Sequence, residues 1–366
     1  MTRRTGLRSG LRGGLVVRAG LALLAVAVVP VLLGGCSAQG SAATPAGPAE
    51  ELRLGYFDNV THAPALVGLE KGLLADSLGD TELSSQVFSA GPATIEALSA
   101  GAIDAAYIGP NPAVNSFIKS AGQSVRIVAG AASGGAALVV RAGIDGPADL
   151  AGTTIATPQL GNTQDVALRA WLGEQGYDTD TTGGGQVHIA PTDNAQTLAL
   201  FRSGKIDGAW VPEPWVSRLV QDAGATVLVD EASLWPDGAF PTTVLLVRSE
   251  YLAEHPETVR ALVAGHTASV DWLTAHPDES AAVINTKLTE DTGKGLSEAV
   301  ITRALSHVTF TTDPLAATFP VLLGAGVTVG TAKPGKLAGL FDLSALNAVR
   351  AEAGVAPVSA AGLGTE

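Results

Sequence analysis

One stretch of this sequence occurs twice, and it constrains the fold more than any other feature. The first copy, TIEALSAGAIDAAYIGPNP, begins at Thr94, and the second, TLALFRSGKIDGAWVPEPW, begins at Thr197. Matching positions lie 103 residues apart throughout, so that Gly101 aligns with Gly204. Each copy predicts an amphipathic helix that ends at a glycine, then a short apolar strand, then a proline-containing loop that begins another helix.

The spacing of the two copies predicts two similar α/β lobes. Solenoid repeats have periods of roughly 20 to 50 residues, which is far shorter than the spacing seen here. At 366 residues the chain also exceeds the usual size of a single core. In open α/β sheets, ligands bind beyond the carboxyl ends of the strands. The loops at 109–112 and 211–215 should therefore both border a ligand crevice between the lobes.

Two apolar strands that end in Val-Arg predict the crossings between the lobes. They are ALVVRAG (137–143) and VLLVRSE (244–250), one on each side of a block of roughly 100 residues. This pairing places 51–137 and 241–350 in lobe one and 138–240 in lobe two. We expect residues 351–366, which are small and weakly polar, to form a poorly ordered C-terminal tail.

The first 35 residues predict an export signal. Five arginines precede the apolar run GLALLAVAVVPVLL (20–33), which is too short and too interrupted by proline to be a good membrane span. The run ends in Leu-Gly-Gly-Cys36, which resembles the bacterial lipobox, and Cys36 is the only cysteine. We expect a lipid on Cys36, followed by a flexible tether over 36–50. A buried structural thiol is the alternative, and Sec or Tat export stays open.

Charge excludes one class of partner. Five of the 22 basic residues lie in the signal, so the remaining chain carries 17 basic against 35 acidic residues, a net charge of −18. Such a surface repels nucleic acid, and we expect no nucleic-acid binding. If the ligand is an anion, local dipoles rather than the overall field must hold it.

Five loops share a design that meets this requirement: a strand end, then small or polar residues, then a helix start. They are 61–64, 89–92, 109–112, 161–164 and 212–215. A helix N-terminus presents unpaired N–H groups and the positive end of the helix dipole, so several of them converging on one crevice form an anion site. A single such loop is more often an ordinary helix start. The candidate ligand-binding residues are His62, Ser89, Gly91, Pro92, Gly109, Asn111, Gly161, Asn162, Thr163, Gln164, Glu213 and Trp215.

Three of these candidates have alternative roles. Glu213 can bind the amine of a zwitterion, or it can cap its own helix. His62 can donate to an oxyanion, or it can be a capping or surface residue. Trp215 can pack against the apolar part of a ligand, or it can belong to the core. The other histidines show no ligand spacing, and no phosphate-binding or dinucleotide-binding motif is present, so we expect neither metal nor cofactor.

Four segments of the sequence resemble a known family. LGYFDNVTHAPALVGLEKGLL, SAGPATIEALSAGAIDAAYIGPNPA, GNTQDVALRAWL and GAWVPEPW are similar to segments of the substrate-binding proteins of bacterial ABC importers for sulfonates, taurine and nitrate. The resemblance covers roughly 52–330. It implies the type II periplasmic-binding-protein fold, with two α/β lobes joined by two crossing strands around a ligand cleft. It also implies a sulfonate held by backbone amides and small polar side chains of loops such as 89–92, 109–111 and 161–164.

The resemblance also implies capture without chemistry. We expect an extracytoplasmic lipoprotein, anchored to the outer face of the cell membrane and monomeric. It would bind a small anionic organosulfur solute, close its second lobe through Asn162, Thr163 and Trp215, and present the solute to an ABC permease and its ATPase. Nitrate, bicarbonate and thiamine-pyrimidine binding remain alternatives. So does an enzyme related to the family that makes a thiamine pyrimidine, although that family's active site is rich in His and Cys.

Overall fold

The computed structural model describes residues 46–366, which belong to one compact unit. The predicted signal over 1–35, the lipid on Cys36 and most of the predicted tether lie outside the described residues. The end of that tether packs against the folded chain, because Ala49 is buried and its N–H donates to Thr258 Oγ1 at 2.8 Å. Within residues 46–366, no helix is both long and apolar enough to span a membrane.

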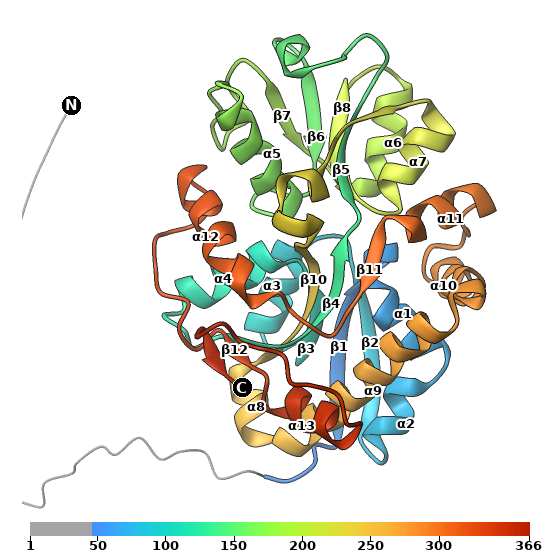
Figure 1. The fold of residues 1–366 in the computed structure, drawn as a ribbon, viewed down its shortest axis with the longest axis vertical. Helices are drawn as coiled ribbons and strands as arrows, with labels where there is room; N and C mark the ends of the chain where they lie inside the picture. Colours follow the sequence, from blue (N-terminus) through green and yellow to red (C-terminus); the bar gives the residue numbers. More distant parts are fainter. Residues whose placement is uncertain (1–45) are drawn as a thin grey trace, which may run out of the picture. The chain divides into compact units, whose positions relative to one another are not determined.

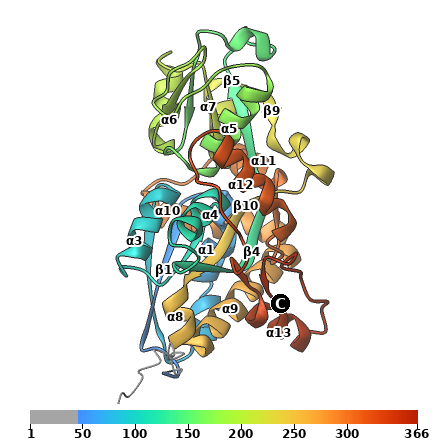
Figure 2. The same ribbon diagram turned by 90° about the vertical axis from the view of Figure 1, so that its left-hand side faces the viewer.

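Two β-sheets with helices on their faces organise the chain (Figures 1 and 2). The first sheet has the strand order β13-β12-β4-β10-β3-β1-β2, with β11 also paired to β4. Its strands are β1 Glu51–Phe57, β2 Glu82–Phe88, β3 Ala105–Ile108, β4 Val125–Gly134, β10 Pro241–Arg248, β11 Val308–Phe310, β12 Phe341–Asp342 and β13 Gly364–Thr365. The helices around it are α1 Ala63–Glu70, α2 Leu73–Leu78, α3 Gly91–Ser99, α4 Pro110–Lys119, α8 Ser249–Glu254, α9 Pro256–Ala275, α10 Pro277–Thr292, α11 Glu298–Ser306, α12 Phe319–Thr328 and α13 Ser344–Glu352.

The second sheet has the order β7-β6-β8-β5-β9. Its strands are β5 Ala136–Val140, β6 Thr154–Thr157, β7 His188–Pro191, β8 Gly208–Pro212 and β9 Thr226–Asp230. In Figure 1, α5 (Thr163–Glu174) covers one face, and α6 (Asn194–Arg202) and α7 (Trp215–Ala223) cover the other. Each face has its own apolar core: Trp171 and Trp210 lie in the core under α5, and Phe201 and Trp215 lie in the core under α6 and α7.

The repeated stretch folds as predicted. The first copy ends α3 and contains β3 and the start of α4, and the second copy does the same with α6, β8 and α7. The repeated aspartate has the same role in both: Asp104 pairs with Arg248 at 2.9 Å, and Asp207 pairs with Arg141 at 3.0 Å. Each aspartate also accepts a backbone N–H from the parallel neighbour of its strand, at 3.0 Å from β1 and 2.8 Å from β6. The shared sequence thus fixes a shared strand arrangement.

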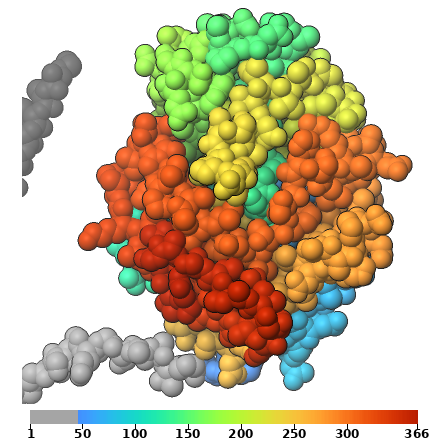
Figure 3. All heavy atoms as spheres, in the orientation of Figure 1, coloured from blue at the N-terminus to red at the C-terminus, as the bar shows by residue number. Residues whose placement is uncertain are grey.

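The chain crosses twice between the sheets, but not within the two strands that end in Val-Arg. β5 stays in the second sheet, antiparallel to β8, and β10 stays in the first sheet, antiparallel to β3. These two strands are equivalent members of the two sheets, which explains their similar sequences. The crossings are Gly135, between β4 and β5, and residues 231–240, between β9 and β10. The second crossing is the yellow segment in the middle of Figure 3. The exact lobe boundaries stay a prediction.

Part of the C-terminal segment pairs and packs with the first sheet, which contradicts the expectation of a poorly ordered tail over 351–366. After α13 the chain returns to the first sheet, where β13 pairs in parallel with β12. Ala360 is fully buried and Val358 nearly so. These two small apolar side chains anchor the segment by burial, which its composition of mostly small residues did not predict.

Candidate functional site

A small cavity lies where the strand ends of the two sheets face each other. The first sheet's side contributes the end of β1, residues that follow β1 and β2, the residue before α4, and Thr242 near the start of β10. The second side contributes the end of β8 and the starts of α5 and α6. Its lining residues are Phe57, Asn59, Thr61, His62, Ser89, Gly109, Asn162, Thr163, Gln164, Asn194, Pro212 and Thr242. Its volume is about 10 Å³, enough for about one water molecule, so the two sides meet closely here.

Four helix N-termini converge on this cavity. Gly109 and Asn162 are the N-cap residues of α4 and α5, Ser89 precedes the N-cap of α3, and Asn194 is the first residue of α6. Each helix has nine residues or more, and the first four N–H groups of a helix have no partner within it. These groups and the helix dipoles make the cavity positive without a cationic side chain, since no Lys or Arg lines it. The arrangement suits a small oxyanion.

His62 adds a neutral hydrogen-bond donor. Its Nδ1 accepts the backbone N–H of Phe57 at 3.2 Å, which places the ring proton on Nε2, and its ring stacks on Phe57 at a centroid distance of 4.4 Å. Burial lowers the pKa of His62 to about 3, so the imidazole stays neutral near pH 7. A neutral imidazole with Nε2–H can donate to an oxyanion but cannot act as a base through Nδ1.

Two buried polar atoms in the cavity wall lack a partner among residues 46–366. They are Thr163 Oγ1 and Asn194 Oδ1, on side chains that are 2% and 6% exposed. An unsatisfied buried polar group costs about 1–3 kcal/mol, so a ligand that bonds to these atoms gains in proportion. They are the first atoms that we expect a bound solute to satisfy.

Close contacts hold the two sides together. The backbone N–H of Gly91 donates to Asn162 Oδ1 at 3.3 Å, and the indole N–H of Trp215 donates to Asn59 Oδ1 at 2.8 Å. At Gly109 an added Cβ would stand 2.5 Å from Thr163 Oγ1, which is shorter than real Cβ contacts. Glycine at this position therefore allows the start of α5 to approach α4.

Six predicted site residues lie on this cavity: His62, Ser89, Gly109, Asn162, Thr163 and Gln164. The other six do not line it. Gly91 touches Asn162, and Pro92 follows it in the first turn of α3. Gly161 donates its N–H to Asp165 at 2.9 Å, and Trp215 donates its indole N–H to the cavity residue Asn59. Asn111 and Glu213 point elsewhere.

Glu213 is a capping and pairing residue in this structure. One carboxylate oxygen accepts the N–H of Ser217 in the first turn of α7 at 3.0 Å, and the other lies 2.9 Å from the Arg303 guanidinium. The side chain is 1% exposed, and burial raises its pKa. Of the two roles left open by the sequence, capping matches the structure, since the carboxylate does not line the cavity.

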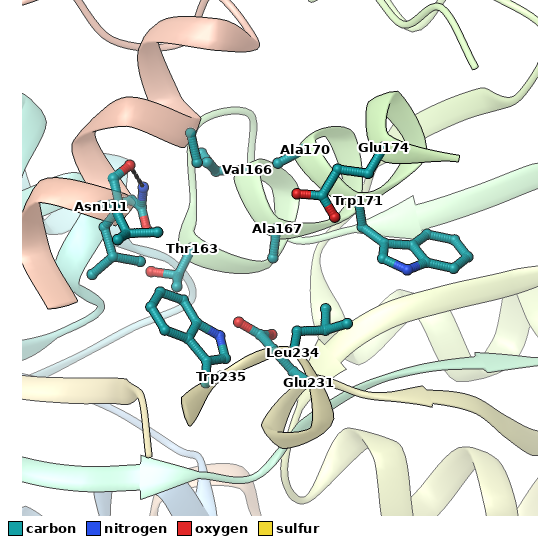
Figure 4. Close-up of a pocket in the computed structure, with 13 residues that line it drawn as sticks. Asn111, Thr163, Val166, Ala167, Ala170, Trp171, Glu174, Glu231, Leu234 and Trp235 are labelled. Atoms are coloured by element: carbon teal, nitrogen blue, oxygen red, sulfur yellow. Dashed lines mark hydrogen bonds between the residues drawn. The ribbon is translucent and has the colours of Figure 1, made fainter. Parts of the chain in front are cut away.

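A second, mostly apolar pocket lies on the other side of Thr163 (Figure 4). It has a volume of about 190 Å³ and is lined by α5, α12, the start of α4 and the second crossing. Asn111 lies at one end, where its Nδ2 donates to the Leu322 carbonyl at 3.2 Å while Oδ1 has no partner in residues 46–366. Glu231 also faces the pocket, and burial raises its pKa to about 7.

No metal site is present in the described part of the chain: it holds no group of three or more His, Cys, Asp or Glu side chains placed around a common point. Cys36 lies outside this part.

Comparison with known proteins gives the family. The NMT1-like family matches residues 45–287 of the chain. This range includes both copies of the repeated stretch and every cavity residue. The chain belongs to the NMT1-like family.

Other similarities agree with this family. The taurine-binding periplasmic protein of Escherichia coli (strain K12) is 29% identical over 215 residues, covering 59% of this chain and 64% of that protein. The alkanesulfonate-binding protein SsuA of Xanthomonas axonopodis pv. citri, solved with MOPS bound, has a TM-score of 0.64 at 21% identity, covering 80% and 96% of the chains. The nitrate-binding protein NrtA of Synechocystis PCC 6803 has a TM-score of 0.67 at 17% identity, covering 78% and 83%. The fold of this NMT1-like chain is the type II periplasmic-binding-protein fold.

Sequence reasoning missed several cavity residues, among them Asn59, Asn194 and Thr242. One of them had a usable signal. The offset of 103 residues that aligns the two copies also aligns Gly91 with Asn194, so the start of α6 is the counterpart of the predicted loop 89–92. Thr242 had no such signal, because β10 reaches the cavity only through its pairing with β3 and β4.

Proposed function

We propose that this chain is the extracytoplasmic solute-binding lipoprotein of an ABC importer. It captures a small anionic organosulfur compound, an aliphatic sulfonate or taurine, and delivers it to a membrane permease and its ATPase. The lipid on Cys36 holds it at the outer face of the cell membrane. The observation that carries the proposal is the convergence of four helix N-termini and the His62 Nε2–H on one cavity without a Lys or Arg.

The charge of the protein supports this reading of the cavity. A net charge of −18 outside the signal would repel an anion at long range, so the anion's affinity must come from short-range donors. Backbone N–H groups at helix starts are fixed in direction by the helix itself. They therefore lose little freedom when they bind a tetrahedral or planar oxyanion, which favours tight binding.

Closure of the two sides around the solute completes the site. The donors come from both sheets' sides, and the contacts Gly91–Asn162 and Trp215–Asn59 form only when these sides meet. A solute that bonds to both sides favours the closed form by its differential affinity for that form. The closed form is then the state that a permease can distinguish from the open one.

Enzyme chemistry has less support. The cavity contains hydroxyls, but His62 cannot activate them as a base, because its Nδ1 is bonded to the Phe57 N–H and its pKa is lowered to about 3 by burial. The only cysteine of the chain is Cys36 in the predicted lipobox. A nucleophile and a base within hydrogen-bond reach are what an acyl- or sulfur-transfer site would require.

A second candidate is an importer for an inorganic oxyanion such as nitrate or bicarbonate, and the small volume of the cavity favours it. We prefer an organosulfur solute because a wider mouth of about 410 Å³ adjoins the cavity and shares Asn59, Ser89 and Asn194 with it, which gives room for an organic tail. This mouth is lined in part by Val87 and Phe88.

Thermal unfolding against a ligand panel tests the proposal. The panel contains ethanesulfonate, taurine, nitrate, bicarbonate and a thiamine pyrimidine, each added to the chain without its signal. A ligand at 100 times its dissociation constant stabilises by about 2.7 kcal/mol, which raises the unfolding temperature by a few degrees. We expect a shift with the two sulfonates. A shift with nitrate or the pyrimidine alone would replace the organosulfur assignment.

A further inference from the structure

The apolar pocket on the other side of Thr163 has room for a ligand of its own. Its volume of about 190 Å³ exceeds that of a cavity of roughly 150 Å³ that holds benzene. Trp171 and Trp235 line it, together with Leu234 and Val321, two large apolar side chains that are 45% and 60% exposed. A small ring in this pocket would remove apolar surface of these side chains from water, which favours binding.

One wall of this pocket carries a buried carboxyl group. Glu231 begins the short 3₁₀ turn Glu231–Leu234 in the second crossing, and it is 2% exposed. Its Oε2 accepts the indole N–H of Trp210 at 2.7 Å, whereas Oε1 forms no hydrogen bond within residues 46–366. Figure 4 shows this carboxyl group pointing into the pocket beside the Trp235 ring. A buried carboxyl oxygen that faces a cavity without a hydrogen bond favours a ligand that donates one.

The charges around Glu231 favour a donor with positive charge. No Lys, Arg or His lines the pocket, and the exposed carboxylate of Glu174 on α5 turns toward the same space in Figure 4. Burial raises the pKa of Glu231 to about 7, and the adjacent Asp230 raises it as well, while the indole N–H groups of Trp210 and Trp235 lower it. A cation in the pocket would favour the ionised carboxylate, and the faces of the lining indole rings attract cations too.

We infer that this pocket is a second binding site, and that its ligand is a small apolar ammonium compound, a primary amine on one ring. The ammonium donates to Glu231 Oε1, and the ring packs against Trp235, Val321 and the alanines of α5. The net charge of −18 outside the signal attracts such a cation at long range, whereas it repels the anion of the other cavity. The site goes beyond the proposed function, because it requires no assumption about what the anion cavity binds.

Calorimetric titration of the chain without its signal tests the site with benzylamine, benzyl alcohol and methylammonium. Benzylamine has a ring and a charge, benzyl alcohol has the ring alone, and methylammonium has the charge alone. At about pH 8 benzylamine should bind about tenfold more tightly than either of the others, because only benzylamine contacts both the apolar walls and the carboxylate. At about pH 6 its affinity should fall by about tenfold, because most Glu231 carboxyl groups then hold a proton that the amine must displace, while benzyl alcohol should be nearly unaffected.

Three variants locate the site. Glu231→Gln keeps an acceptor for the Trp210 indole but removes the charge, so the preference for benzylamine over benzyl alcohol and its pH dependence should both disappear. Ala167→Leu fills the pocket from α5 and should weaken the binding of both ring compounds by about tenfold or more. Glu96→Gln, an exposed carboxylate on α3, removes the same charge away from the pocket and should leave all three affinities unchanged.

Four outcomes would overturn the inference. Equal affinity of the unaltered protein for benzylamine and benzyl alcohol at about pH 8 would show that the pocket does not select a cation. An unchanged preference in Glu231→Gln, or unchanged binding in Ala167→Leu, would place the amine elsewhere on this acidic protein. Binding of none of the three compounds would refute the site. The ligand and pH comparisons need no variant, so they stay decisive even if a substitution impairs folding, and none of these outcomes depends on sulfonate binding.

Discussion

Replacing Gly109 with alanine should hinder closure of the two sides around a solute without destabilising the fold. The backbone of Gly109, at φ −68° and ψ 151°, accepts alanine without strain. The added Cβ would stand 2.5 Å from Thr163 Oγ1 and 3.8 Å from the Thr242 carbonyl. Thr163 Oγ1 would have to retreat by about 0.9 Å to reach ordinary contact, which begins at 3.4 Å. Because Thr163 begins α5 on the other side of the cavity, this clash opposes the closed form.

The size of the expected loss of sulfonate affinity follows from the cost of overpacking. An extra methyl group in a close-packed contact costs about 1–3 kcal/mol, so we expect sulfonate affinity to fall by about 5- to 150-fold. An open form has no such clash, and a glycine replaced by alanine at a compatible backbone position often gains about 0.4–1 kcal/mol. The unfolding temperature without ligand should therefore hold or rise slightly. Calorimetric titration and a thermal scan measure the two quantities.

Two further variants make the reasoning refutable. Gly173→Ala lies on the same helix α5, where an added Cβ meets nothing within 4 Å, so it should leave affinity unchanged. In a Thr163→Ala background the clashing Oγ1 is gone and the Thr163 Cβ stands at 3.5 Å, so adding Gly109→Ala should cost little more. An equal penalty in both backgrounds, or a lower unfolding temperature without ligand, would refute the account.

Three other predictions concern residues around the cavity. Glu213→Gln should lower the free energy of unfolding by about 1–3 kcal/mol, because it weakens the buried pair with Arg303. In titrations it should change the affinities for taurine and for ethanesulfonate equally. A loss of affinity for taurine alone would show that Glu213 binds an amine. Trp215→Phe removes the indole donor to Asn59 and should weaken sulfonate binding by about fivefold; unchanged affinity would exclude this contact from closure. The folded-state pKa of His62, about 3, lies below its unfolded value of 6.5, so unfolded chains bind the proton first and stability falls as pH drops from 6.5 toward 3, by about 1.4 kcal/mol per pH unit. Urea unfolding at about pH 7 and about pH 5 should show a smaller fall in His62→Gln, while His266, with a pKa lowered to about 4 by burial, contributes its own fall in both proteins.

The helices and strands of the repeated stretch could be predicted because the residues that begin and end them lie within the stretch itself. The repeated stretch contains its own helix end, strand and helix start, and the five loops with early prolines or small polar residues do begin helices in the structure. Asn162 and Thr163 could be placed on the crevice for the same reason, since a helix start after a strand lies at the carboxyl edge of the sheet.

Contacts between residues far apart in the sequence determine the features that local patterns could not predict. Glu213 is paired with Arg303, which lies 90 residues further along the chain, so its capping role and its amine-binding role could not be separated beforehand. The similarity of the two strands that end in Val-Arg predicts crossings between the lobes, whereas in the structure this similarity reflects the equivalent pairing of Arg141 and Arg248 with the repeated aspartates. The C-terminal strand depends on β12, which no local pattern indicates.

A crystal structure with ethanesulfonate bound would locate the anion site itself. We expect the sulfonate oxygens at the N-termini of α3, α4, α5 and α6, with His62 Nε2 and Thr163 Oγ1 within hydrogen-bond distance of them. A sulfonate bound instead in the apolar pocket beside Trp235, or outside the helix N-termini altogether, would contradict it.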